Sequence, residues 1–507
     1  MTPTTLILTL LPVVGPALVA AAALAGRRAR WTDLAAPASA VLILVCGIAL
    51  VPVTMHDGPS VWGVLRADPL AAYLLAVMGA VAATATWSGM APRWADSRPD
   101  GWFAALMCLF EAAMAAALVA DNLGVMWVAV EATTIATAFL VGYRGGRSAV
   151  EAAWKYVVLG SVGVAVALLG IVLLYAATGS AATLSWSALV SGSIPMDHGL
   201  TRMAAALTAL GLATKAGLAP MHSWLPDAHS QAPAPVSGLM SGVLLSVAFS
   251  GILRVQAVSD AVLGPHSLRS LLLVAGLASL LVAALLVLTQ RDYKRLLAYS
   301  SIEHMGLLAL GAAVGSPLAL GAVLLHILGH GLAKASLFVV AGRILAAEGS
   351  ARIGDVRALL TRRPALAVPF LVGMVALLGF PPFGLFVTEL GIVYAGWQQG
   401  LGWAMAVALV LLLVVFAGLA RHTLAMTLGR PGRSRAETAH DTVHSDTVHV
   451  DGALHGAHPH GGRHGYPDGP TAPLVLALGV VGLLGLAVLP LREVLTSAAT
   501  LLIGGTP

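Results

Sequence analysis

Residues 211–242 read GLATKAGLAPMHSWLPDAHSQAPAPVSGLMSG, and the interpretation of the whole chain starts from this stretch. It places Lys215 inside an apolar helix, which Ala219 and Pro220 then interrupt. A lysine at bilayer depth costs roughly 2.5–3.5 kcal/mol on insertion scales. A helix is broken at that depth only where protein or water meets its freed backbone groups. The stretch therefore predicts part of a polar path through a membrane, followed by a polar, proline-rich turn from His222 to Pro235.

The composition is that of a membrane protein. Of the 507 residues, 58% are hydrophobic and 10% are charged, and the mean hydropathy is +0.88. Apolar runs of around 20 residues follow one another, and each is long enough to cross a bilayer. We therefore expect an all-α polytopic membrane protein in the lipid bilayer. The net charge of +5 comes mainly from Lys and Arg between the runs, so no nucleic-acid partner is predicted.

Fourteen spans are expected from the apolar runs. They are residues 5–25, 34–55, 68–90, 101–119, 121–143, 151–177, 200–221, 233–257, 268–289, 292–314, 316–346, 364–398, 402–428 and 472–497. Counted with the adjoining span ends, loops after odd-numbered spans hold 20 Lys and Arg, whereas loops after even-numbered spans hold 4. Because positive charge collects on the cytoplasmic side, this alternation predicts a multi-pass protein of the cell (plasma) membrane with both termini outside.

Two of the expected spans contain a break. Span seven is broken at residues 218–220, and span twelve at the motif FPPFG, residues 380–384. Paired discontinuous helices are typical of inverted-repeat transporters, so spans 4–8 and 9–13 are interpreted as two inverted five-helix repeats. Two unrelated proline kinks are the alternative. The expected domains are a three-span segment (1–100), a proton-conducting core (101–428), a histidine-rich loop (429–470) and a C-terminal span (471–507).

The loop 429–470 differs in kind from the rest. It is polar and carries seven of the sixteen histidines at irregular spacing. A solvated, disordered cytoplasmic linker is expected there, with weak metal binding or pH sensing as the alternative. The two cysteines, Cys46 and Cys108, lie in separate apolar runs, so neither a disulfide framework nor a cysteine-ligated cluster is predicted. No cofactor and no structural metal are expected.

Ionisable side chains inside the spans form a candidate proton pathway. Its main members are Glu131, Lys215, His304, His330, Lys334 and Glu389, and its secondary members are Lys155, Glu303, His326, Glu111 and Ser246. His326, His330 and Lys334 are four residues apart, so they share one helix face over about 12 Å of axis. A helix–helix hydrogen bond is the alternative role for His326 alone. Helix packing or a subunit interface is the alternative for Glu111.

A glutamate–lysine pair predicts a switch. At about 4 Å and an effective dielectric near 20, two opposite charges interact by roughly 4 kcal/mol. Moving Glu131 a few ångströms from Lys215 would therefore favour release of the lysine proton. We expect this separation to gate proton transfer towards Lys334 and Glu389.

The segment KAGLAPMHSWLPDAHSQAPAPVSG resembles the signature of antiporter-like subunits shared by respiratory complex I, Mrp-type sodium/proton antiporters and group 4 hydrogenases. The resemblance covers about residues 100–430. Within it, WVAVEATT, EAAWKY, YSSIEHMG and GFPPFGLFVTE are most similar to hydrogenase-4 and formate hydrogenlyase membrane subunits of the F type.

This resemblance implies roles for individual residues. Glu131 and Lys215 match the glutamate–lysine pair of the family, and Glu389 matches its exit-side ionisable residue. Lys334 and His304 match polar positions of the central axis. Ser246 stands where many family members carry a lysine, so the link from Lys215 to Lys334 must rely on water and on His304 or His330.

We therefore expect a proton-translocating, non-catalytic membrane subunit of a hydrogenase-like or complex I-like oxidoreductase complex. Its partners would be other membrane subunits and peripheral iron–sulfur or hydrogenase-like subunits. The alternatives are an Mrp-type Na⁺/H⁺ antiporter subunit, a non-pumping coupling or scaffold subunit, and a membrane partner for inorganic-carbon uptake. A self-contained enzyme is the weakest alternative, because no loop assembles a nucleophile, a base and an anion site. Residues 222–229 are interpreted as the cap of the broken helix.

Overall fold

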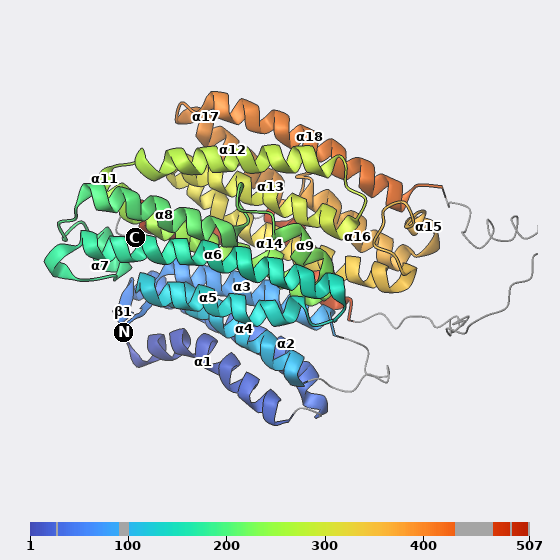
Figure 1. Cartoon of the computed structure of the whole chain (residues 1–507), viewed down its shortest axis with the longest axis horizontal. Coiled ribbons are helices and arrows are strands. Elements are labelled where there is room, and N and C mark those ends of the chain that lie inside the picture. Colours follow the sequence, from blue (N-terminus) through green and yellow to red (C-terminus); the bar gives the residue numbers. More distant parts are fainter. Residues whose placement is uncertain (27–28, 91–100, 431–469, 487–488, 505–507) are drawn as a thin grey trace, which may run out of the picture.

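The computed structural model describes residues 1–26, 29–90, 101–430, 470–486 and 489–504 (Figure 1). In these ranges the chain is helical apart from one antiparallel hairpin, β1 (Ser60–Trp62) and β2 (Leu65–Ala67). Eleven helices of the described part are long and apolar enough to cross a membrane. The prediction of an all-α polytopic membrane protein is confirmed, and the small hairpin is an addition to it.

Three spans precede the conducting core. The helices are α1 (Pro3–Ala25), α2 (Ala35–Asp57) and α3 (Pro69–Ser88), with the short η1 (Arg30–Leu34) before α2. Each of α1 and α3 begins with a polar N-cap, Thr2 or Asp68, followed by proline in the first turn. Proline suits that place because its missing N–H has no helical partner there. Of the three, α3 is buried most.

The first five-span unit follows, and its helices pack through small residues. It comprises α4 (Gly101–Val119), α5 (Leu123–Val141), α6 (Arg147–Ala177), α8 (His198–Ala216), and an eighth span made of α10 (Ala234–Leu239), the π-helical η3 (Met240–Leu244) and α11 (Leu245–Leu263). The short η2 (Gly179–Ala181) and α7 (Trp186–Val190) connect α6 to α8. A Cβ at Gly163 of α6 would collide with Thr214 of α8. Close helix approach of this kind needs small residues, and it sets α6 directly against the Lys215 end of α8.

Span seven is broken where the sequence predicts it. Helix α8 ends at Ala216, and Gly217 adopts a left-handed φ of 73°. The freed amide of Ala219 donates to Oγ of Ser279 at 2.9 Å, so protein groups satisfy the interrupted backbone, as membrane depth requires. The expected polar turn from His222 to Pro235 is wrong in one respect. It contains a further helix, α9 (Leu225–Gln231), because its apolar residues are buried against the bundle.

The second five-span unit contains the other predicted break. Its helices are α12 (Ser267–Val287), α13 (Tyr293–Val314), α14 (Pro317–Glu348), α15 (Leu359–Arg362), α16 (Pro364–Leu377), α17 (Gly384–Gln398) and α18 (Gly402–Thr427). Span twelve is interrupted between α16 and α17, where Gly379 has a left-handed φ of 65°. Both interruptions are confirmed, while the inverted relation of the two units stays a prediction.

The last span differs from the single helix expected over 472–497. Helix α20 (Ala472–Leu484) has 13 residues, about 20 Å of axis against a hydrocarbon core of roughly 30 Å. The short η4 (Leu489–Leu491) and α21 (Arg492–Leu502) complete the segment. A Cβ at Gly384 would lie 2.7 Å from Cβ of Leu484. The helix therefore ends against the break of span twelve.

The described helices account for all fourteen predicted membrane spans. To the eleven long apolar helices are added α8, the α16–α17 pair and the α20–α21 pair. Figure 1 places the N and C labels at the same end of the bundle and α15 at the opposite end. An even number of crossings requires the two termini to share a side. Which side faces the cytoplasm stays a prediction, and residues 431–469 of the histidine-rich loop lie outside the described residues.

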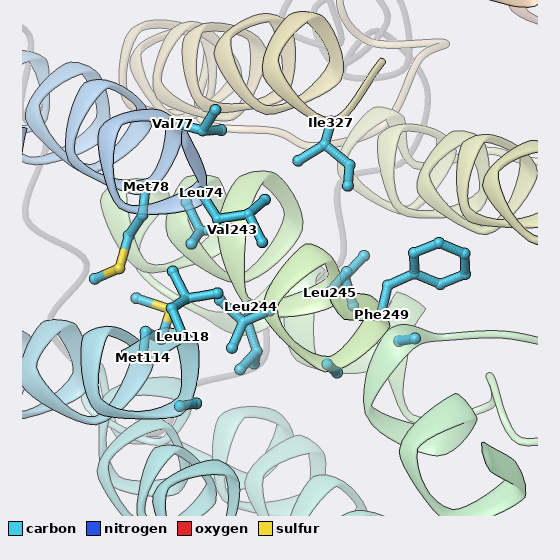
Figure 2. Close-up of a cluster of buried hydrophobic side chains, with 14 of the residues drawn as sticks. Leu74, Val77, Met78, Met114, Leu118, Val243, Leu244, Leu245, Phe249 and Ile327 are labelled. Atoms are coloured by element: carbon cyan, nitrogen blue, oxygen red, sulfur yellow. The ribbon is translucent and has the colours of Figure 1, made fainter. Parts of the chain in front are cut away.

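The N-terminal three-span segment is not separate from the core. In Figure 2, side chains of α3, α4, η3, α11 and α14 meet in one apolar cluster. Met78 of α3 lies near Met114 and Leu118 of α4, with Leu244 beside them. Helix α21 packs on α3 and α14 as well. The buried centre therefore joins both five-span units to the third and last spans.

Candidate functional site

Lys215 lies at the end of α8 with no exposed surface. Its Nζ donates to the hydroxyl of Tyr156 at 3.0 Å and lies 4.3 Å from the centre of the same ring. The tyrosine hydroxyl is also 2.6 Å from Oγ1 of Thr137. A Cβ at Gly160 would lie 3.0 Å from Nζ, so the glycine leaves room for the ammonium group. Lys215 is thus held by a cation–π contact and a hydrogen bond from one side chain of α6.

Glu131, the predicted partner of Lys215, is bound elsewhere. Its carboxylate accepts hydrogen bonds from Thr134 at 3.0 Å and from Ser161 at 3.1 Å. Within the described ranges no carboxylate lies within the 4.0 Å ion-pair distance of the Lys215 Nζ. The two groups therefore stand in the separated arrangement of the predicted switch, with Tyr156 in contact with the ammonium group.

Lys334 is the corresponding buried lysine of the second unit. It is fully buried on α14. Its Nζ donates to the carbonyl of Leu297 at 2.7 Å and to the hydroxyl of Ser300. Both acceptors lie on α13, Ser300 one turn and Leu297 about two turns before Glu303 and His304. Lys334 thus bridges α14 to the helix that carries the next titratable groups.

Three buried histidines link α13, α14 and α17. Nδ1 of His304 lies 3.1 Å from Nε2 of His326, whose Nδ1 lies 2.8 Å from Oγ1 of Thr388. The rings of His304 and His330 are 5.0 Å apart, and both nitrogens of His330 lack a hydrogen-bond partner in the described part of the chain. A neutral imidazole donates through one nitrogen and accepts through the other, so His326 can pass a proton while holding two helices together.

Two carboxylates follow the histidines. Nε2 of His304 lies 3.6 Å from Oε2 of Glu303. Glu303 and Glu389 line one cavity of about 270 Å³ beside the break of span twelve. A Cβ at Gly379 would collide with the Glu389 carboxylate, so the glycine of the break makes space for this acid. His304, His326, Thr388 and the two acids form one polar group in the second unit.

The middle of the path is not joined by direct hydrogen bonds. Tyr156, Trp224, His229 and Phe338 form an aromatic row between Lys215 and Lys334, with successive ring centres 4.9, 6.1 and 5.4 Å apart. The hydroxyl of Ser246 on α11 is buried without a partner in the described ranges. Proton passage from Lys215 to Lys334 stays a prediction, and across this row it would rely on water, as expected from Ser246 in place of a lysine.

Two secondary candidates do not join the path. The Lys155 side chain is 46% exposed and pairs with Glu151 at 2.8 Å and Asp227 at 3.1 Å at the rim of the bundle. Glu111 is fully buried on α4, and neither of its carboxylate oxygens has a partner among the described residues. Over the same residues, no cluster of three His, Cys, Asp or Glu side chains is arranged to hold a metal ion.

Some contact residues of the site were not predicted from the sequence. Tyr156, Ser300 and Thr388 bear neutral hydroxyls, so a search for ionisable groups within spans passes over them. Tyr156 and Thr388 directly adjoin Lys155 and Glu389 in the sequence. For these two residues, the position next to a predicted ionisable site residue was the sequence signal that could have identified them.

Residues 120–416, more than half of the chain, match the family described as NADH:quinone oxidoreductase/Mrp antiporter, transmembrane. The chain belongs to this family. The matched range contains the site residues Glu131, Lys215, His304, His326, His330, Lys334 and Glu389. The predicted membership of the antiporter-like family is therefore confirmed.

Two relatives are named after the two kinds of complex that the motifs resemble, a hydrogenase-4 and an NADH-quinone oxidoreductase. A hydrogenase-4 component F homolog of Methylacidiphilum infernorum is 40% identical over 280 residues, which cover 54% of this chain and 58% of that protein. An NADH-quinone oxidoreductase subunit N of Desulforudis audaxviator is 32% identical over 377 residues, which cover 71% and 74%. This chain therefore matches little more than half the length of the hydrogenase-4 component F homolog.

Solved structures of the family share the fold over nearly the whole chain. A chain of the Mrp complex from Dietzia sp. has a TM-score of 0.84 at 26% identity, covering 99% of this chain and 98% of that chain. A chain of respiratory complex I from Thermus thermophilus has a TM-score of 0.73 at 25% identity, covering 98% and 100%. This protein is thus an antiporter-like, multi-pass membrane protein of the kind found in multisubunit membrane complexes.

Proposed function

We propose that this antiporter-like chain moves protons across the membrane as a subunit of a hydrogenase-like or complex I-like redox complex. One observation carries the proposal. His304, His326 and Thr388 form an unbroken run of close polar contacts, which begins one helical turn beyond Ser300, a contact of Lys334, and ends at Thr388, the residue before Glu389 in the sequence. Membrane interiors rarely hold so many polar groups without a transport role.

Each group in the run has a chemical part in proton transfer. Lys215 holds a proton against the Tyr156 hydroxyl, and the approach or withdrawal of Glu131 changes how firmly it is held. Lys334 exchanges protons with the His304–His326 pair, since a neutral imidazole accepts a proton on one nitrogen and releases one from the other. Glu303 and Glu389 receive the proton at the break of span twelve, which is the proposed exit.

The electron chemistry would lie on partners. Cys46 and Cys108 are buried on separate helices as free thiols, which gives this chain no donor set for an iron–sulfur cluster. Peripheral iron–sulfur or hydrogenase-like subunits, with further membrane subunits, are the proposed partners. The proposed location is the plasma membrane with both termini outside.

A second candidate is an Mrp-type Na⁺/H⁺ antiporter subunit. Its support is the TM-score of 0.84 to a chain of the Mrp complex. A non-pumping coupling subunit is a third candidate, supported by Ser246 and by the aromatic row that separates Lys215 from Lys334. The three candidates differ in what crosses the membrane: protons alone, protons against sodium, or neither.

The test uses the native complex purified through this chain and reconstituted into lipid vesicles. Internal pH and ²²Na⁺ uptake are followed while the complex turns over. Lys215→Ala should lower proton movement by roughly a hundredfold, the effect of losing a positioned proton-transfer group. Lys155→Ala is the matched control, because Lys155 lies on the rim outside the path. Unchanged proton movement in Lys215→Ala contradicts the proposal, and sodium-dependent proton movement selects the second candidate.

A further inference from the structure

The cavity beside the break of span twelve has an unusual lining. It lies between α13, the end of α16, α17 and α18, and its volume is about 270 Å³. Its polar lining residues are Glu303 and Glu389, and all its other lining residues are leucine, valine, phenylalanine or glycine. A cavity with an apolar body and a few convergent polar groups is the usual form of a small-molecule site.

Neither carboxylate accepts a hydrogen bond from a described residue. The Glu303 side chain is only 4% exposed. Its nearest recorded partner, Nε2 of His304 at 3.6 Å, is beyond hydrogen-bond distance and neutralises the carboxylate only when that imidazole is protonated. Glu389 makes neither a hydrogen bond nor an ion pair with any described residue. An isolated carboxylate in apolar surroundings must take up a proton or meet a cation. The cavity is therefore selective for an occupant that brings positive charge or hydrogen-bond donors.

The mouth of the cavity opens through an apolar surface. Leu390 of α17 is 49% exposed and Leu413 of α18 is 67% exposed, and both line the cavity. On a membrane helix, leucines this exposed face lipid or another subunit. Glu389 is partly accessible from this side, whereas Glu303 lies deeper. An occupant therefore enters from the hydrocarbon and must itself partition into the bilayer.

We propose that this cavity binds a lipophilic primary amine in its ammonium form. The ammonium group donates to the carboxylates of Glu389 and Glu303, because three N–H donors match acceptors that receive no hydrogen bond from the described residues. The apolar body packs against the apolar lining, which includes the rings of Phe386 and Phe416. A volume of about 270 Å³ suits a molecule with one aromatic ring and a short alkyl chain.

Occupation of the site has a consequence for transport. An ammonium group at Glu389 prevents that carboxylate from receiving a proton, so the amine inhibits proton movement. This consequence rests on the proposed function, whereas the binding itself does not. A binding assay on the resting protein therefore fails or succeeds independently of any transport activity.

The test is photolabelling of the full-length chain in zwitterionic lipid nanodiscs, which do not concentrate amines by surface charge. The probe is 4-phenylbutylamine bearing a diazirine on its ring. The alcohol of the same skeleton is the uncharged control, and labelled peptides are mapped by mass spectrometry. The amine is expected to label α17 and α18 near Phe386 and Leu413, and excess unlabelled amine should compete. The alcohol should label these helices weakly.

Variants separate the charge contact from apolar partition. Glu389→Gln should lower labelling about tenfold, the loss expected for one charge-assisted hydrogen bond. Glu389→Asp keeps the charge and should retain most of the labelling. Glu111→Gln is the matched control, because it alters a buried, unpartnered carboxylate outside the cavity and should label like the native chain. If Glu389→Gln does not fold, the comparison of amine with alcohol on the native chain decides alone.

Three results would overturn the proposal. Equal labelling by amine and alcohol means that the cavity takes up apolar molecules without regard to charge. Labelling confined to other helices means that the amine binds elsewhere. Labelling of the isolated chain that disappears in the native complex means that a neighbouring subunit fills the cavity, and a cationic side chain of that subunit would then be the occupant.

Discussion

Nζ of Lys215 donates to the hydroxyl of Tyr156, 3.0 Å away, across the contact between α8 and α6. The two residues are 59 positions apart in sequence, and close packing through Gly163 brings their helices together. Glu131 approaches neither atom within hydrogen-bond distance. The direct partner of the buried lysine is therefore a neutral hydroxyl, and the glutamate acts on it from farther away.

Removing that hydroxyl tests its part in holding the lysine. Tyr156→Phe keeps the ring and deletes only the hydrogen-bond acceptor. A hydrogen bond to a charged group contributes roughly 1.5–3 kcal/mol, so proton movement by the reconstituted complex should fall about tenfold or more. Tyr175→Phe on the same helix is the control, because that side chain is 46% exposed and lies outside the path. Equal rates in both variants would show that Tyr156 takes no part.

Thr388 is expected to matter through its hydroxyl rather than its shape. Thr388→Val has nearly the same volume but cannot hydrogen-bond to Nδ1 of His326. Proton movement should fall roughly tenfold, while Thr388→Ser should restore most of it. The measurement is the initial rate of internal pH change in vesicles. If the valine and serine variants behave alike, the His326–Thr388 contact serves packing only.

The close approach of α6 and α8 predicts a stability effect. Gly163→Val places its methyl groups against Thr214, and overpacking of this kind costs about 1–3 kcal/mol. The variant should unfold at a lower temperature in a thermal-shift assay in mild detergent. Gly321→Ala is the control, because a Cβ there meets nothing within 4 Å. An unchanged unfolding temperature for Gly163→Val would mean that the two helices pack less tightly.

Substitution of Lys155 is expected to have little effect on proton movement. Its side chain is 46% exposed and its ion pairs lie at the rim, where such pairs contribute little because water and salt screen them. Lys155→Gln should leave proton movement within about twofold of the native rate, since surface pairs add roughly 0–1 kcal/mol. A large loss would place the entrance of the path at this rim.

Several features of this protein follow from the sequence by itself. Long apolar runs determine that the chain is a bundle of membrane helices, because the hydrophobic effect acts on each run separately. Proline and glycine determine the breaks after Ala216 and Leu377, because proline lacks the backbone N–H of a regular helix and glycine readily adopts a left-handed φ. The same local information identifies which ionisable groups lie at membrane depth, including Lys215, Lys334 and Glu389.

Other features were decided only by the tertiary structure. Tyr156 as the partner of Lys215, the cavity shared by Glu303 and Glu389, and the position of Lys155 at the rim all depend on how helices rotate and pack against one another. So does the end of α20 against the broken span twelve. Apolar helices show little difference between one face and another, so the sequence pattern does not specify which faces meet. Contacts between residues distant in sequence become definite only when the helices have packed.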